Sequence, residues 1–251
     1  MVSNHSLKTT EKEKDNKIKG LFSLQTVSKV GIGTTQKKDI QKKYCFATEI
    51  DDDMVEIRPL NVELVPSSSK KIISKDEFLN KFFPEPEFYM QTVYPKMCEL
   101  KKTIARAERH RKRGETYSAE YEYKNALKID EENIRANFGL GLTYLERGDK
   151  EKANNIFKRL VKLDAAFELK HKHLFNEFGI NLRKQKMFEQ AVEYYGRALE
   201  LSPNDENLHY NIARAYFGQN KIELALTHLK KALELNQELK EAKKFMEFLG
   251  C

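Results

Sequence analysis

The sequence predicts a mainly α-helical protein in which a helical repeat solenoid follows a small α+β domain. The main observation is internal repetition, because residues 172–205 and 206–239 form two consecutive blocks of equal length that align without gaps. Small residues recur at equivalent places in both blocks, such as Ala191 and Ala225, and bulky apolar residues lie beside them. Nearer the N-terminus, several short segments alternate between apolar and polar residues, which is typical of β-strands.

The chain is expected to divide into three parts. Residues 1–19 are polar and rich in Lys and Glu, which predicts a disordered basic tail. Residues 20–86 are expected to form the α+β domain. Residues 87–251 are expected to form the solenoid, together with a leading helix and a capping helix.

Three or four short strands are expected in the α+β domain. Residues 21–30 form the first alternating segment, and residues 42–50 and 55–60 flank three aspartates, which predicts a β-hairpin with an acidic turn. Residues 61–65 are a candidate further strand. The segment Gly31–Gly33 begins like a phosphate-binding loop but lacks the Lys-Ser/Thr ending, so a turn between strands is expected. So small a sheet needs a helix to cover it.

A capping box predicts the first helix, because Ser74 is followed three residues later by Glu77. This helix is expected to begin at Lys75 and to end before Pro84. A long helix is expected next, bent near Pro95, and it leads into the first repeat.

The repeat extends towards the N-terminus in two further copies, residues 134–167 and 100–133. The insertion Glu168–His171 separates the second copy from the third and is expected to lengthen a helix by about one turn. After the last copy, apolar residues at helical spacing predict a capping helix. These residues are Leu239, Ala242, Met246 and Leu249. The period of about 34 residues, with its alternation of small and bulky positions, resembles the tetratricopeptide repeat. The resemblance covers about residues 100–239 and implies a right-handed solenoid of about four repeats.

In tetratricopeptide repeat proteins, the first helices of successive repeats line a concave groove that binds peptides. The resemblance therefore implies a partner-binding site on this face. Its expected residues are Ile104, Phe138, Leu142, Leu145, Ile180, Arg183, Lys184, Tyr210, Arg214 and Phe217. The implied function is a non-enzymatic adaptor or scaffold that binds a peptide or an amphipathic helix of another protein. The cationic edge of the groove favours acidic residues in that partner. The alternative is that the protein's own tail or terminal helix fills the groove.

Some relatives grip the acidic tail of heat-shock chaperones with Lys, Asn and Arg residues at five fixed positions. Those residues are missing from this sequence. The positions hold Ile104, Glu108, Gly139, His173 and Glu177. The resemblance therefore does not imply a chaperone-binding carboxylate clamp.

A basic stripe supports an alternative function. Its residues are Lys102, Arg106, Arg109 and Arg113, whose spacings place them on one helix face. Arg106 takes a position that the repeat family buries, so either this helix is rotated or its face meets a polar partner. Nucleic-acid phosphate, bound together with the basic tail, is one candidate partner. The acidic segment 49–63 of the same chain is the other, and it is favoured because no aromatic residues interleave the stripe.

Composition argues against several other classes of protein. No apolar run is long enough to span a membrane, and the first residues lack the apolar core of a secretory signal. Cys45, Cys98 and Cys251 are odd in number and widely spaced, so neither a disulfide framework nor a zinc site is expected. We expect no catalytic, metal-binding or cofactor-binding residues, and a cytoplasmic location.

Overall fold

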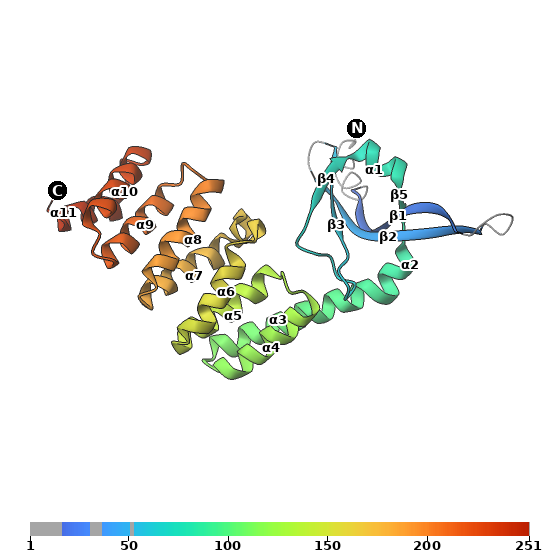
Figure 1. The fold of residues 1–251 in the computed structure, drawn as a ribbon, viewed down its shortest axis with the longest axis horizontal. Coiled ribbons are helices and arrows are strands. Elements are labelled where there is room, and N and C mark those ends of the chain that lie inside the picture. The colour runs from blue at the N-terminus through green and yellow to red at the C-terminus, as the bar shows by residue number, and fades with distance from the viewer. Residues whose placement is uncertain (1–16, 31–36, 51–52, 251) are drawn as a thin grey trace, which may run out of the picture. The chain divides into compact units, whose positions relative to one another are not determined.

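A computed structural model describes residues 17–30, 37–50 and 53–250, and it confirms the predicted fold class (Figure 1). The described part of the chain is mainly α-helical, and its strands are confined to the N-terminal portion. The residues group into two compact units that divide between Leu100 and Lys101. We call them the N-terminal unit and the repeat unit.

Five strands of the described residues form one antiparallel sheet in the order β4-β3-β2-β1-β5. The strands are β1 (Lys19–Val30), β2 (Lys37–Ile50), β3 (Met54–Pro59), β4 (Lys71–Ser74) and β5 (Phe82–Pro84). The hairpin predicted around the aspartates is confirmed, because β2 pairs with β3 and places Ile50 opposite Met54. The turn expected at Gly31–Gly33 lies outside the described residues.

Helix α1 (Lys75–Lys81) covers one face of this sheet. Its Phe78 is fully buried and packs with Ala47, Val55 and Ile73, one from each of three strands. Successive residues of a strand point to opposite faces, so the alternating pattern in the sequence decides which side chains reach Phe78. The sheet therefore has the helical cover that its small size requires.

Helix α1 begins where the capping box predicts. The backbone N–H of Glu77 donates a hydrogen bond to Ser74 Oγ at 3.2 Å. The Glu77 carboxylate pairs with Lys81 one turn later, at 2.8 Å, rather than returning to the cap. The helix ends at Lys81, and Phe82 begins β5.

Aromatic residues after β5 pack on the other face of the sheet. The ring of Phe88 lies 4.7 Å from that of Tyr44, and the ring of Tyr89 lies 5.9 Å from that of Phe46, centroid to centroid. Tyr44 and Phe46 occupy alternate positions of β2, on the face opposite α1. These contacts attach the segment after β5 to the sheet, so the units divide later than the boundary expected after residue 86.

Residues 61–65 form a turn, and the expected strand is absent there. Asn61 Oδ1 accepts hydrogen bonds from the backbone N–H groups of Glu63 (3.0 Å) and Val65 (3.1 Å). Leu64 has a left-handed backbone, with φ of 61°. Local side-chain bonds of this kind compete with strand pairing and stabilise a turn instead.

The ordered sheet begins earlier than the predicted end of the tail. The backbone N–H of Ile18 donates to Glu49 Oε2 at 2.8 Å, and the Ile18 side chain packs on the core around Phe78. Lys19 already belongs to β1, opposite Thr48. The rest of the predicted tail, residues 1–16, lies outside the described residues.

The expected long helix contains a widened turn near Pro95. Its segments are α2 (Pro86–Phe88), the π-helical turn η3 (Tyr89–Val93) and α3 (Tyr94–Lys112). Pro95 has no N–H, and its ring crowds the carbonyl one turn earlier. The Tyr94 N–H accordingly donates to the Tyr89 carbonyl, five residues back, so the predicted irregularity takes the form of a π turn.

Helices of the repeat unit form four successive hairpins among the described residues, and one further helix follows (Figure 1). The hairpins are α3 with α4 (Thr116–Ile129), α5 (Ile134–Arg147) with α6 (Lys150–Leu160), α7 (Lys172–Lys184) with α8 (Phe188–Leu201), and α9 (Glu206–Gly218) with α10 (Ile222–Leu235). The last helix is α11 (Lys240–Phe248). Asn133, Asp149 and Asp205 cap α5, α6 and α9 by accepting backbone hydrogen bonds.

Small residues let these helices approach closely, as the repeat pattern predicts. Ala191 and Ala225 are fully buried. A methyl group added to Gly179 of α7 would lie 2.3 Å from the Tyr195 hydroxyl of α8, and Tyr195 is itself fully buried. Close-packed interiors leave such a ring no room to move aside, so the repeat register depends on these small positions.

The insertion Glu168–His171 does not lengthen a helix as expected. Two short 3-10 turns, η4 (Asp164–Phe167) and η5 (Leu169–His171), precede α7 instead. Glu168 stands between them with an extended backbone, which interrupts the hydrogen-bond ladder that a continuous helix needs.

Aromatic rings fill the core between the second and third hairpins. The Tyr194 ring of α8 lies 4.6 Å from Phe175 and 5.4 Å from Phe178, both on α7. Phe138 of α5 packs edge-on against Phe178 at 5.8 Å. All four rings are buried, so this cluster joins α5, α7 and α8 into one core.

Candidate functional site

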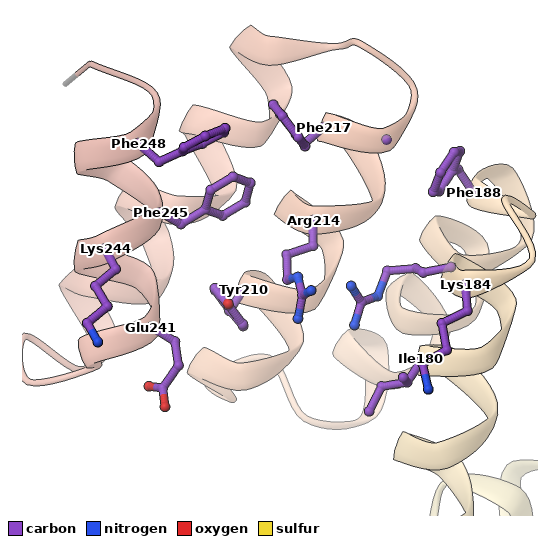
Figure 2. A pocket seen from close by; sticks show the side chains of 12 residues that line it. Ile180, Lys184, Phe188, Tyr210, Arg214, Phe217, Glu241, Lys244, Phe245 and Phe248 are labelled. Carbon is purple, nitrogen blue, oxygen red and sulfur yellow. The ribbon is translucent and has the colours of Figure 1, made fainter.

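The repeat unit contains a groove of about 770 Å³ formed by the last two hairpins and α11 (Figure 2). Its lining residues are Ile180, Arg183, Lys184, Phe188, Tyr210, Arg214, Phe217, Gly218, Glu241, Lys244, Phe245 and Phe248. We call it the α7–α11 groove. Spacings of four and three residues put Tyr210, Arg214 and Phe217 on one face of α9.

Six of the residues predicted to bind a partner line this groove. They are Ile180, Arg183, Lys184, Tyr210, Arg214 and Phe217. The first three come from the C-terminal half of α7 and the others from α9. The structure therefore brings together the predicted residues of the last two repeats.

The other four predicted residues do not line the groove. Ile104, Phe138, Leu142 and Leu145 are buried in the helical core. Helix α7 packs directly against α5, where Phe138 contacts Phe178, and this packing covers the face of α5 that the resemblance implied to be open. The prediction that the groove runs along the first repeats is wrong for this reason.

Ion pairs also connect the first helices of the first three repeats. Arg111 of α3 pairs through Nη1 with Glu146 of α5 and, at 3.0 Å, with Glu177 of α7. Arg135 of α5 pairs with Glu108 of α3 at 2.8 Å. These contacts link α3, α5 and α7 side by side, whereas the α7–α11 groove lies at the last two repeats and α11.

The terminal helix supplies groove residues that the sequence analysis missed. The predicted apolar face of α11 is confirmed, with Ala242 fully buried on the last repeat. A second face of α11 carries Phe245 and Phe248, and Glu241 and Lys244 share it at spacings of three and four residues. The spacing of these four residues is the sequence signal that could have indicated that α11 lines the groove. Helix α11 is thus a wall of the groove and does not fill it.

Three phenylalanine rings form the apolar end of the groove. The Phe217 ring lies 5.3 Å from Phe245 and 5.9 Å from Phe248, with interplanar angles of 87° and 78°. Figure 2 shows these rings gathered on α9 and α11, with Lys184 on α7 across the groove. The Phe217 ring stands nearly perpendicular to the other two, and the three rings together form an apolar cup.

Phe188, the first residue of α8, approaches α9 at Gly218. A methyl group added to Gly218 would lie 2.3 Å from the Phe188 ring. Only a residue without a side chain allows this approach, so Gly218 holds Phe188 at the edge of the groove.

The basic stripe lies on the exposed face of α3 and on Arg113, the residue that follows it. Its residues Lys102, Arg106, Arg109 and Arg113 are all exposed. Arg106 donates to the two carboxylate oxygens of Glu122 in α4, at 3.2 and 3.1 Å. Thr103, Ile104 and Ala107 take the buried positions of α3 instead. Arg106 therefore has a carboxylate partner within its own repeat, which is neither of the two partners expected from the sequence.

Glutamates of the acidic segment 49–63 have ion-pair partners within the N-terminal unit. Glu49 pairs with Lys75 at 2.8 Å, and Glu63 approaches Lys96 at 3.7 Å. The expected pairing of this segment with the basic stripe would involve both units, and it stays a prediction.

A pair of histidines joins α9 to α10. His209 Nδ1 lies 3.1 Å from His228 Nδ1, a distance that allows a hydrogen bond when only one of the two nitrogens carries a proton. Burial lowers the pKa of both imidazoles, and the positive charge of Lys231 lowers that of His209 further. Sequence reasoning did not pair these residues, because they are distant in the chain and meet only when the hairpin folds.

This pair predicts that the free energy of unfolding decreases as the pH falls below about 6.5, the ordinary histidine pKa. The folded-state pKa values are lowered, so the unfolded state binds protons more readily and acid favours it. Each additional proton bound by the unfolded state contributes at most about 1.4 kcal/mol per pH unit, and solvent screening reduces this contribution for two half-buried groups. Urea unfolding between about pH 7.5 and pH 5 should show a flatter dependence for His209→Gln/His228→Gln than for the wild type.

Two comparisons make this pH experiment specific. His173→Gln is the matched control, because it replaces an exposed histidine of a different helix, α7. Burial lowers the pKa of His171 to about 4. This residue is present in every variant, so its contribution to the pH dependence cancels when variants are compared. An unchanged pH dependence in the double variant would contradict the assignment.

The described residues show neither a metal site nor a membrane-spanning helix. They contain no group of three or more His, Cys, Asp or Glu side chains placed to hold a metal ion. None of their helices combines the length and the apolar character needed to cross a membrane.

The fold and the groove define a helical repeat protein with a concave pocket at its last repeats. Residues 135–165 and 182–247 match models of the tetratricopeptide repeat. The matched segments cover the second hairpin and the chain from the end of α7 to α11, and they are similar to tetratricopeptide repeats, in agreement with the sequence pattern.

One curated relative is the anaphase-promoting complex subunit cut9 of Schizosaccharomyces pombe. It is 32% identical over 100 residues, which are 39% of this chain and 15% of the relative. The chain therefore spans less than a sixth of the length of that relative.

Similar solved structures include MamA from Desulfovibrio magneticus RS-1, at 21% identity and a TM-score of 0.46, covering 59% of this chain and 82% of the other. The pilF protein of Pseudomonas aeruginosa is 20% identical with a TM-score of 0.44, and the match covers 59% of this chain and 66% of the other.

Proposed function

We propose that the repeat unit is a non-enzymatic protein-binding scaffold that holds a segment of a partner protein in the α7–α11 groove. The observation that carries this proposal is the exposure of large apolar side chains in one concave site. Ile180 and Phe217 are each 37% exposed, and Phe248 is 72% exposed. Contiguous apolar surface of this kind usually marks an interaction site.

The size and composition of the groove support binding of a protein segment. Its volume lies within the range of about 300–1,000 Å³ typical of ligand sites. Its described lining is made of aromatic, aliphatic and basic residues with Glu241 as the carboxylate, which suits recognition better than acid–base or nucleophilic chemistry. A groove between helices accepts an amphipathic helix or an extended segment. The relative cut9 is by its name a subunit of a multiprotein complex, which accords with such a role.

Affinity capture with the full chain tests this proposal. Phe217→Ala/Phe248→Ala should lose the main partner, because aromatic anchors in concave sites contribute about 2 kcal/mol or more each, about 30-fold in Kd. The matched control is Tyr121→Ala/Leu224→Ala, which removes exposed apolar side chains outside the groove. The affinity of the captured partner would then be measured by calorimetry, with circular dichroism to verify folding. Retention of the partner by the groove variant, with loss in the control, would reject the groove.

A further inference from the structure

The α7–α11 groove carries an excess of positive charge without internal compensation. Arg183, Lys184, Arg214 and Lys244 line it, against the single carboxylate of Glu241. Within the described residues, none of these five side chains forms an ion pair, although ion pairs are frequent elsewhere in the repeat unit. The charge of the groove is therefore available to a ligand.

Arg183 is the least satisfied of these cations. Its Nε is shielded from solvent and has no hydrogen-bond partner among the described residues. Its Nη2 makes a long contact of 3.5 Å to Asn211 Oδ1, and the guanidinium also interacts with the Tyr195 hydroxyl. Burial lowers the pKa of Arg183, and the positive charge of nearby Arg214 lowers it further. Burying a guanidinium beside a second one is unfavourable unless an anion compensates them.

Arg214 completes the cationic part of the groove. Its guanidinium carbon lies 5.7 Å from the centre of the Tyr210 ring, and Figure 2 shows both side chains at the groove. Two guanidinium groups close together present several N–H donors, a geometry that suits the two oxygens of a carboxylate. The apolar cup of Phe217, Phe245 and Phe248 lies in the same groove.

We infer that the α7–α11 groove recognises an acidic segment of a partner protein, with an Asp or Glu carboxylate bound by Arg183 and Arg214 and a neighbouring bulky apolar side chain in the phenylalanine cup. This inference rests on the proposed function and names the chemistry of the partner. The three phenylalanine rings argue for a bulky apolar side chain in the cup. Charge complementarity argues for a carboxylate beside it.

The test uses a phage-displayed library of random short peptides, selected on the immobilised full chain. The selection should enrich peptides that combine an acidic residue with nearby Phe, Leu, Ile or Tyr. One enriched peptide, labelled with a fluorophore, is then titrated with the chain, in its selected form and with its acidic residue changed to the amide. The amide form should bind about tenfold to hundredfold more weakly, because it loses a charge-assisted hydrogen bond.

A double-mutant cycle assigns that loss to the two arginines. In Arg183→Gln/Arg214→Gln the amide substitution in the peptide should have almost no further effect. Lys230→Gln/Lys243→Gln removes the same charge outside the groove and should retain the full effect of the substitution. Arg214 is exposed, so Arg214→Gln alone remains informative if the double variant does not fold.

The outcomes separate this inference from the proposed function. Peptides that require Phe217 and Phe248 but bind equally well in the acid and amide forms would contradict the inferred carboxylate recognition. They would still support the proposed binding of a partner segment in the α7–α11 groove. Selected peptides whose affinity is unchanged by Phe217→Ala/Phe248→Ala would contradict both the inference and the proposed function. If acidic peptides are not enriched and the purified chain forms dimers that Arg214→Gln dissociates, a second copy of the chain occupies the groove and the inference fails.

Discussion

Replacing Tyr194 with Ala is expected to lower the free energy of unfolding by about 3–5 kcal/mol, the range for deleting a large buried ring. Tyr194 is fully buried and contacts Phe175 and Phe178 of α7. Its removal leaves a cavity that neighbouring rings in regular helices cannot fill. Urea unfolding followed by circular dichroism measures the loss, and Tyr121→Ala, at an exposed position of α4, should change stability by less than about 0.5 kcal/mol.

Replacing Tyr194 with Phe is the informative companion, because it is expected to change stability in the opposite direction. The Tyr194 hydroxyl is buried and has no hydrogen-bond partner among the described residues. A desolvated, unpaired hydroxyl costs about 1–3 kcal/mol, so its removal should stabilise the fold by about 1 kcal/mol. A loss of stability in Tyr194→Phe would show that the hydroxyl is satisfied in solution.

The second large effect distinguishes core residues from groove residues. Phe138→Ala is expected to destabilise the repeat unit by about 3–5 kcal/mol, because Phe138 is fully buried against Phe178. Phe217→Ala should cost less than about 1 kcal/mol, since its ring is partly exposed, and should weaken partner binding instead. Unfolding curves and partner titrations on the two single variants measure both effects.

The contrast between these variants tests where the groove begins. A Phe138→Ala protein as stable as the wild type would place Phe138 on an open surface, as the family resemblance implied. A Phe217→Ala protein that loses several kcal/mol would make Phe217 part of the core.

Features that depend on neighbouring residues along the chain followed from the sequence. The repeat register is one, because small residues such as Ala191 and Ala225 must stand where two helices touch. The cap of α1 is another, because Ser74 and Glu77 form it within a single turn. The hairpin of β2 and β3 likewise results from alternation on both sides of a short turn.

Features with a competing local interaction were less predictable. Residues 61–65 alternate like a strand, but the side chain of Asn61 binds two backbone N–H groups and stabilises a turn. The insertion Glu168–His171 has the length of a helical turn, but the extended backbone of Glu168 interrupts the helix. Propensity and length alone do not indicate which of two local hydrogen-bond patterns has the lower free energy.

The sequence by itself determined that the last repeats present Arg214 and Phe217 on one face of α9, because helical periodicity is a local property. Only the tertiary structure decided which equivalent positions are open. Leu145 and Phe217 occupy the same position of their repeats, yet Leu145 is fully buried and Phe217 is partly exposed. Exposure depends on the next helix: α7 packs directly on α5, whereas α11 stands beside α9 and leaves the groove between them accessible.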